Sequence, residues 1–221
     1  MNSIKYACNL NNQGVDLLVS GELSRATIAF ESAVGLLKEA VHEAETSSCI
    51  GVDQSCDIAS LPFRESISTV AGLNRLRCYV YDHGIMIPGN GNGETQATIS
   101  LYIAIVLFNL ALASHCEATA LGRAKSMKKA SVLYSLAVQL LARCAMPEIT
   151  STTTLTLLAL NNKAQIHYDQ GEYVQHAGCM KYVSQILGNG HVFPVTLKHK
   201  DVEGLLLNVM LLGAPLAAQA A

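Results

Sequence analysis

Histidine and cysteine are the residue types of this chain that are best suited to catalysis or metal binding, and each occurs seven times. The cysteines form no Cys-x-x-Cys pair and the histidines no His-Glu-x-x-His pattern, the spacings typical of zinc sites. His115 and Cys116 are adjacent, and adjacent residues do not face together on a helix. We therefore expect no metal, no cofactor and no enzymatic activity, and we interpret the cysteines as buried, reduced thiols.

A glycine-rich stretch, residues 89–95, suggests a nucleotide-binding loop. It lacks the lysine of such loops, however, and Glu94 would repel a phosphate at a helix N-terminus. We interpret the stretch as a hinge loop. The chain has 15 basic and 17 acidic residues, for a net charge of -2, and this balance argues against a nucleic-acid partner.

The elements that would position any site are helices. Hydrophobic residues make up 50% of the chain and charged residues only 14%, which predicts a large aliphatic core. Apolar residues recur at helical spacing in six stretches, and turn signals at Gly21 and Gly171 separate two pairs of them. The pattern predicts a single domain, residues 1–221, that is mainly α and contains helical hairpins at about 5–45, 95–145 and 152–188.

The two remaining regions are an insert, residues 46–94, and a C-terminal segment, residues 189–221. In the insert we expect a surface loop at 46–64, a short helix at 65–76 and a β-like stretch at 77–88. Residues 79–81 and 85–87 flank Asp82, His83 and Gly84, which predicts a β-hairpin. Residues 205–212 could be helix or strand. Because a lone hairpin is marginal in water, we expect the insert and the tail to form a small sheet against the helices.

Two apolar stretches are long enough to be compared with a membrane span. Residues 99–113 are too few for a bilayer, which needs about 20. Residues 204–221 are interrupted by Asn208, Gly213 and Pro215. We therefore expect a packed tail, no membrane association and a location inside the cell, in the cytoplasm or the nucleus.

The three hairpins share a pattern of small and large residues. Gly14 precedes Ala26-x3-Phe30 in the first, Ala111 precedes Ala130-x3-Tyr134 in the second, and the third repeats only the first-helix part, at Ala164. This pattern resembles the tetratricopeptide-repeat (TPR) superfamily. The chain also resembles uncharacterised TPR-like proteins of microalgae over residues 107–113 and 160–164, a likeness that implies no activity. The predicted core includes Phe30, Leu110, Ala111, Tyr134 and Ala164.

The repeats depart from that family in their spacing. Asn12, Asn109 and Asn162 occupy equivalent positions, yet they are 97 and 53 residues apart, whereas TPR units repeat every 34 or so residues. The second repeat also has about seven extra residues between Ala111 and Ala130.

These three asparagines are the candidate site. The TPR resemblance implies that the first helix of each hairpin lines a concave groove, where asparagine amides could bind the main chain of an extended peptide. Alternatively, they bind neighbouring helix backbones and fix the stacking. The other candidate groove residues are Asn161, Gln165, Phe108 and Leu112. No basic pair accompanies them, so acidic chaperone tails are disfavoured as ligands.

We therefore expect a non-catalytic protein- or peptide-binding scaffold whose partner is unknown. The alternative is a structural or self-associating subunit, such as a homo-oligomer, whose groove is filled by its own insert and tail. A groove occupied by residues 77–88 or 203–213 would favour that alternative.

Overall fold

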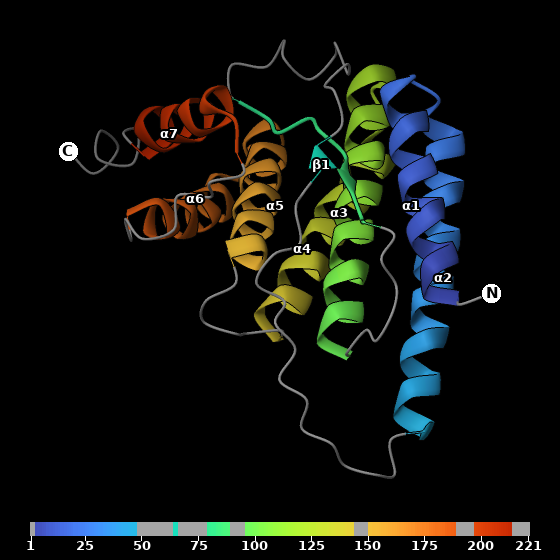
Figure 1. The fold of residues 1–221 in the computed structure, drawn as a ribbon. Helices are drawn as coiled ribbons and strands as arrows, with labels where there is room; N and C mark the ends of the chain where they lie inside the picture. The colour runs from blue at the N-terminus through green and yellow to red at the C-terminus, as the bar shows by residue number, and fades with distance from the viewer. Residues whose placement is uncertain are drawn as a thin grey trace.

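The computed structural model describes residues 3–47, 64–65, 79–88, 96–143, 150–188 and 197–213 (Figure 1). This part of the chain is mainly α-helical, as predicted. Its helices are α1 (Ser3–Val19), α2 (Leu23–Ser47), α3 (Gln96–Leu121), α4 (Ala124–Arg143), α5 (Thr150–Asp169), α6 (Tyr173–Gly188) and α7 (His199–Gly213). The glycine-rich stretch 89–95, residues 48–63 and residues 66–78 lie outside the described residues, so the expectations for them stay predictions.

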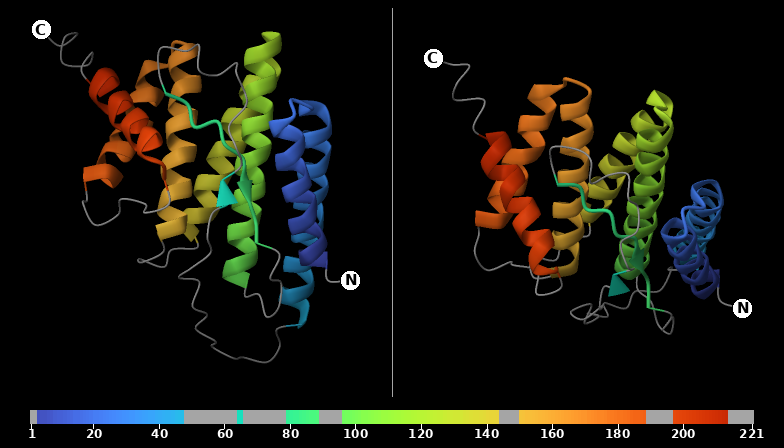
Figure 2. Two further views of the ribbon diagram at one scale, coloured as in Figure 1. Left: turned by 45° about the horizontal axis from the view of Figure 1, so that its top comes forward. Right: turned by 90° about the horizontal axis from the view of Figure 1, so that it is seen from above.

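The helices form antiparallel hairpins that stack side by side. Each helix from α1 to α6 packs against the next helix in the chain. In addition, α3 contacts α1 and α5. The first helices of the hairpins therefore share one side of the molecule, together with α7 (Figure 2). We call the surface formed by α1, α3, α5 and α7 the inner face.

The three hairpins turn in the same way. Gly21, Gly122 and Gly171 each adopt a positive φ, between 63° and 80°, one or two residues after the first helix of their hairpin ends. The residue after each glycine donates its amide hydrogen to a carbonyl five residues earlier, the bond of a Schellman helix end. Glycine suits this turn because a Cβ would be strained there. The repeated turn supports three equivalent hairpin units.

The extra residues of the second hairpin extend both of its helices at the end next to the turn. From Ala111 to the turn glycine Gly122 is four residues more than from Gly14 to Gly21, and from Gly122 to Ala130 is three more than from Gly21 to Ala26. Each addition is close to one turn of α-helix. The same faces therefore meet in both hairpins despite the insertion.

The aliphatic core lies within and between the hairpins, and the predicted core residues are buried. Phe30, Ala111 and Tyr134 are 0% exposed, Ala164 1% and Leu110 5%. The small residue of the first repeat allows close helix approach: a Cβ on Gly14 would lie 2.5 Å from a ring carbon of Phe30.

The longest core helix is α3, which is apolar on all sides. By length and composition, Thr98–Leu121 could cross a membrane, but 94% of its most apolar window is buried inside the protein. Such burial is compatible with the central helix of a soluble protein.

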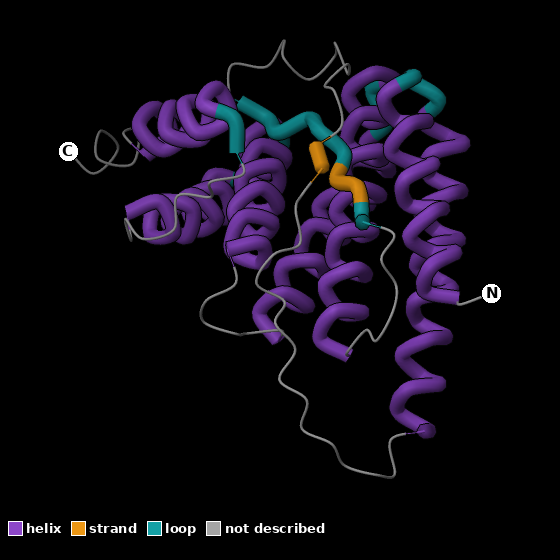
Figure 3. Tube along the Cα trace, in the orientation of Figure 1, coloured by secondary structure: helices purple, strands orange, loops and turns teal. Residues whose placement is uncertain are grey.

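Three expectations about the insert and tail were wrong. Residues 79–88 do not turn back at Asp82–Gly84 to form a hairpin; they run as one extended stretch across the inner face (Figure 3). The two-residue strand β2 (Ile85–Met86) pairs antiparallel with β1 (Arg64–Glu65), so Glu65 does not begin a helix. The tail does contact the insert, but it does so as helix α7 and not as a strand. The main-chain hydrogen-bonding groups of a helix are paired within the helix, so side chains such as that of Asn208 make the contact.

Candidate functional site: an asparagine ladder around an extended segment

One asparagine from each helix of the inner face binds both the N–H and the C=O of one residue in the extended segment, residues 79–87. These four residues, which we call the asparagine ladder, are Asn12 on α1, Asn109 on α3, Asn162 on α5 and Asn208 on α7. The segment runs from α7 toward α1, opposite to the order of the helices in the chain (Figure 3). Residues from four helices thus converge on nine consecutive positions.

Each ladder asparagine binds both main-chain groups of a single residue. Its side-chain oxygen accepts the amide hydrogen, and its side-chain nitrogen donates to the carbonyl oxygen of the same residue. The pairs are Asn208 with Tyr79, Asn162 with Tyr81, Asn109 with Ile85 and Asn12 with Ile87, with all eight distances between 2.6 and 2.9 Å.

This geometry follows from the extended backbone. In an extended chain, the N–H and C=O of one residue point to the same edge, which is how an antiparallel neighbour exchanges two hydrogen bonds with it. A carboxamide carries one acceptor and one donor group at the same separation, so it can replace that neighbour. The ladder therefore acts as one edge of a β-sheet made from side chains.

Contacts with other helix side chains hold the ladder amides in place. Asn109 donates to Asn11 at 2.8 Å, and Asn11 in turn donates to the carbonyl of Ile85 at 3.0 Å. Asn162 donates to the hydroxyl of Tyr134 at 3.2 Å. These bonds connect the amides of Asn109 and Asn162 to side chains outside the segment.

At the other end of the segment, Asn161 plays a similar supporting part. Its side-chain nitrogen donates to the carbonyl of Tyr79 at 3.1 Å, and its oxygen accepts a hydrogen bond from Asn208 at 2.7 Å. Paired asparagines therefore serve both ends of the segment.

The apolar side chains of the segment are also buried. Val80, Tyr81, Ile85 and Ile87 are each at most 1% exposed. The ring of Tyr81 lies 6.2 Å from that of Phe108, which continues the contact into the hairpin core. Main-chain and side-chain contacts together fix the segment.

Two glycines let the backbone approach closely. A Cβ on Gly84 would lie 3.0 Å from a methyl carbon of Val15 and 3.5 Å from one of Leu18, so the segment rests directly on α1. A Cβ on Gly204 would lie 2.2 Å from the ring of Tyr79, so α7 rests on that ring.

The centre of the segment lacks an asparagine partner. The ladder contacts fall on alternate residues, and His83 is where that alternation would place a fifth one. The side chain of His83 is also without partners, because neither of its ring nitrogens has a hydrogen-bond partner among the described residues. Its Nε2 lies 3.7 Å from a carboxylate oxygen of Asp82 and 3.9 Å from one of Asp201, and all three side chains are buried. The other carboxylate oxygen of Asp201 is also unpartnered among these residues.

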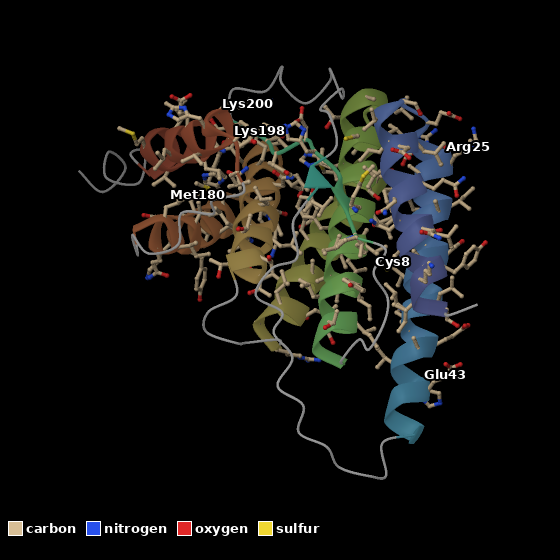
Figure 4. The ribbon with its side chains drawn as sticks, viewed as in Figure 1. Cys8, Arg25, Glu43, Met180, Lys198 and Lys200 are labelled. Atoms are coloured by element: carbon tan, nitrogen blue, oxygen red, sulfur yellow. The ribbon has the colours of Figure 1, made fainter. Side chains whose placement is uncertain are left out.

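Burial dominates the electrostatics of this centre. It lowers the pKa of His83, although the carboxylates of Asp82 and Asp201 oppose that shift, while the charges of Lys198 and Lys200 at the start of α7 add to it (Figure 4). The imidazole is therefore neutral at physiological pH. Burial, and a 2.7 Å hydrogen bond donated to Asp201, raise the pKa of the Tyr79 hydroxyl.

The predicted site residues are partly brought together. Asn12, Asn109, Asn162 and Asn161 all bind the segment, and Phe108 packs near Tyr81. Leu112 is fully buried. Gln165 is buried as well, but its side-chain nitrogen donates to Asp169 at 2.8 Å.

Sequence reasoning missed Asn208, the fourth ladder residue, and the part played by Asn11. A signal for Asn208 was available: it follows a leucine in an apolar helical stretch, as Asn11 and Asn161 do. It lies 46 residues after Asn162, a spacing close to the 53 residues between Asn109 and Asn162.

The buried histidine and cysteine of α3 are held in their uncharged forms. Burial lowers the pKa of His115 to about 4 and raises that of Cys116 to about 12. No group of three metal-ligating side chains is found among the described residues.

The chain matches no family model, no curated protein and no solved structure. Its likeness to the TPR superfamily stays a prediction from the sequence.

Proposed function

We propose that the protein is a non-catalytic, protein-binding helical scaffold whose inner face recognises extended polypeptide, with its own residues 79–87 as the resident occupant. The observation that carries this proposal is the ladder, in which four side chains each bind both main-chain groups of one residue. Main-chain hydrogen bonds supply affinity in known modes of extended-peptide recognition. A TPR-like origin and a place in the cytoplasm or nucleus belong to the same proposal.

A structural subunit without a ligand is the second candidate. The occupation of the inner face by residues 79–87 is the outcome expected for this candidate. The depth of the occupant favours it as well, because Tyr81, His83 and Ile85 are each 1% exposed. In that case the segment is a permanent strut that ties α7 to α1, and any self-association uses other surfaces.

Native-state hydrogen exchange separates the two candidates. A scaffold that opens should exchange the amides of Tyr81 and Ile85 through an opening that costs less free energy than global unfolding. The main-chain amides of Leu110 and Ala111, in the middle of α3, serve as the internal control and should exchange only by global unfolding. If all four amides share the global free energy, the inner face stays closed and the structural candidate replaces the scaffold.

A further inference from the structure

We propose that the inner face binds, in exchange for residues 79–87, an extended peptide of another protein that carries an aromatic residue three positions before a glycine. This inference rests on the proposed function and names the chemistry of the partner. The resident segment defines that chemistry, because it shows which positions the face restricts and which it leaves open.

The glycine requirement comes from α1. At position 84 of the segment, a methyl group would lie 3.0 and 3.1 Å from the two methyl carbons of Val15. Such distances are shorter than ordinary carbon–carbon contacts, which begin near 3.5 Å. Any larger side chain at this position would push the segment away from α1 and stretch the neighbouring bonds of Ile85 to Asn109.

The aromatic requirement comes from α3 and α4. The ring of Tyr81 packs 6.2 Å from Phe108, whose ring lies 5.6 Å from that of Tyr134. Buried aromatic anchors of this kind dominate the energetics of most interfaces. Ile85 and Ile87 add buried apolar area directly after the glycine.

The way the inner face is built favours exchange of residues 79–87 for another peptide over their permanent occupation of this face. The ladder amides also bind side chains outside the segment, as Asn109 does with Asn11 and Asn162 with Tyr134, so part of their hydrogen bonding does not depend on the segment. The unpartnered nitrogens of His83 make the centre of the segment its weakest part. An empty face would expose unpaired amides, so the open state should be a minor one that an incoming extended chain traps.

The resident segment competes with any peptide at the high effective concentration of a tethered ligand. The apparent affinity of a peptide is its intrinsic affinity reduced by the fraction of open molecules. A change that weakens the resident segment alone must therefore strengthen peptide binding.

The test uses a fluorescent peptide with the sequence of residues 79–88 and measures its binding by anisotropy. To the full-length Gly84→Ala protein, the peptide should bind at least tenfold more tightly than to the wild type. A peptide with alanine in place of the glycine should bind that variant at least tenfold more weakly. Equal affinity of the two peptides, or no binding to a folded Gly84→Ala protein, overturns the proposal.

A matched double variant controls for indirect effects. Val15→Ala removes the two methyl carbons that the methyl group added by Gly84→Ala would meet, so the resident segment should return to the inner face of the Val15→Ala/Gly84→Ala protein. Peptide affinity should then fall back toward the wild-type value. A double variant that binds as tightly as Gly84→Ala contradicts the assigned contact.

Should Gly84→Ala not fold, the wild-type protein provides a second measurement. Excess glycine-containing peptide should accelerate exchange of the protein's own Tyr81 and Ile85 amides, and the alanine peptide should not. No acceleration by either peptide overturns the proposal. If those amides open below the global free energy in the absence of peptide, the scaffold survives and only its ligand chemistry is wrong; if they do not, both proposals fail.

Discussion

Helix α1 has two buried sides with opposite chemistry. Toward α2 it presents Gly14, which meets the ring of Phe30 in an apolar contact. Toward the extended segment it presents Asn11 and Asn12, which bind the carbonyls of Ile85 and Ile87. The contact with α2 therefore depends on shape, whereas the contact with the segment adds hydrogen bonds from side-chain amides to main chain.

The two sides differ in how they tolerate error. An apolar interface loses contacts gradually as side chains shift, whereas a buried hydrogen bond that is lost leaves an unsatisfied donor or acceptor. We expect the inner face to be more sensitive to the loss of one side chain, and the hairpin interior to be more sensitive to the addition of one.

The largest effect is expected from Asn109→Ala. It leaves the amide hydrogen of Ile85 and the side-chain oxygen of Asn11 without their partners, both at buried positions. At roughly 1–3 kcal/mol for each group, the free energy of unfolding should fall by about 2–6 kcal/mol. Urea denaturation measures this value. A loss below about 1 kcal/mol would show that water replaces the bonds and that the inner face is less sensitive than the comparison requires.

The second effect concerns His115, a polar residue buried between α3 and α4. Its ring lies 6.3 Å from that of Tyr134, and its nitrogens have no partner among the described residues. Because its pKa is about 4 in the folded protein and 6.5 when unfolded, the unfolded state binds the proton more tightly. Stability is therefore full above pH 6.5 and is lost as the pH falls toward 4, by about 3 kcal/mol.

Denaturation of the wild type and of His115→Leu at about pH 7.5 and pH 4 measures that loss. The two proteins share every other titrating group, so the difference between their pH dependences belongs to His115. The variant should lose about 3 kcal/mol less than the wild type on acidification. Parallel pH profiles would mean that His115 is not buried in its neutral form.

The third effect is an addition to the hairpin interior, Gly14→Ala. Alanine favours helix over glycine by about 1 kcal/mol, but its methyl carbon would lie 2.5 Å from the ring of Phe30. We expect overpacking to prevail and the protein to be destabilised by about 1–3 kcal/mol. In the Phe30→Leu background the same change should cost less, or stabilise. Equal costs in both backgrounds would place the two residues out of contact.

The hairpins could be predicted because their determinants are local. Apolar spacing, a turn glycine such as Gly21 or Gly171, and a small residue such as Gly14 each act within a single hairpin. A short stretch of sequence therefore contains the whole signal for each hairpin. The seventh helix was less clear, because residues 205–212 are apolar without the one-sided pattern that separates a helix from a buried strand.

The position of the asparagines was predictable, but what they bind was not. Equivalent places on three helices suggested a common ligand, and the residues around Asn109 and Asn162 do converge. Their ligand, however, lies 24 and 81 residues away in the chain. The pattern of residues 79–87 predicts a hairpin because apolar residues alternate around Asp82 and Gly84, yet one extended strand satisfies that pattern equally well. Only the tertiary contact with α1 explains Gly84.

The smallest effect is expected from Asn12→Ala, the same substitution at the open end of the ladder. Asn12 makes the same two bonds as Asn109, to the amide and carbonyl of Ile87, but its side chain is only partly buried. Water can therefore replace part of what is lost. We expect the free energy of unfolding to fall by about 1 kcal/mol, against several for Asn109→Ala. Hydrogen exchange should show faster exchange at Ile87 with little change at Tyr81. If Asn12→Ala costs as much as Asn109→Ala, burial does not set the strength of a ladder position, and the four asparagines act as one cooperative unit.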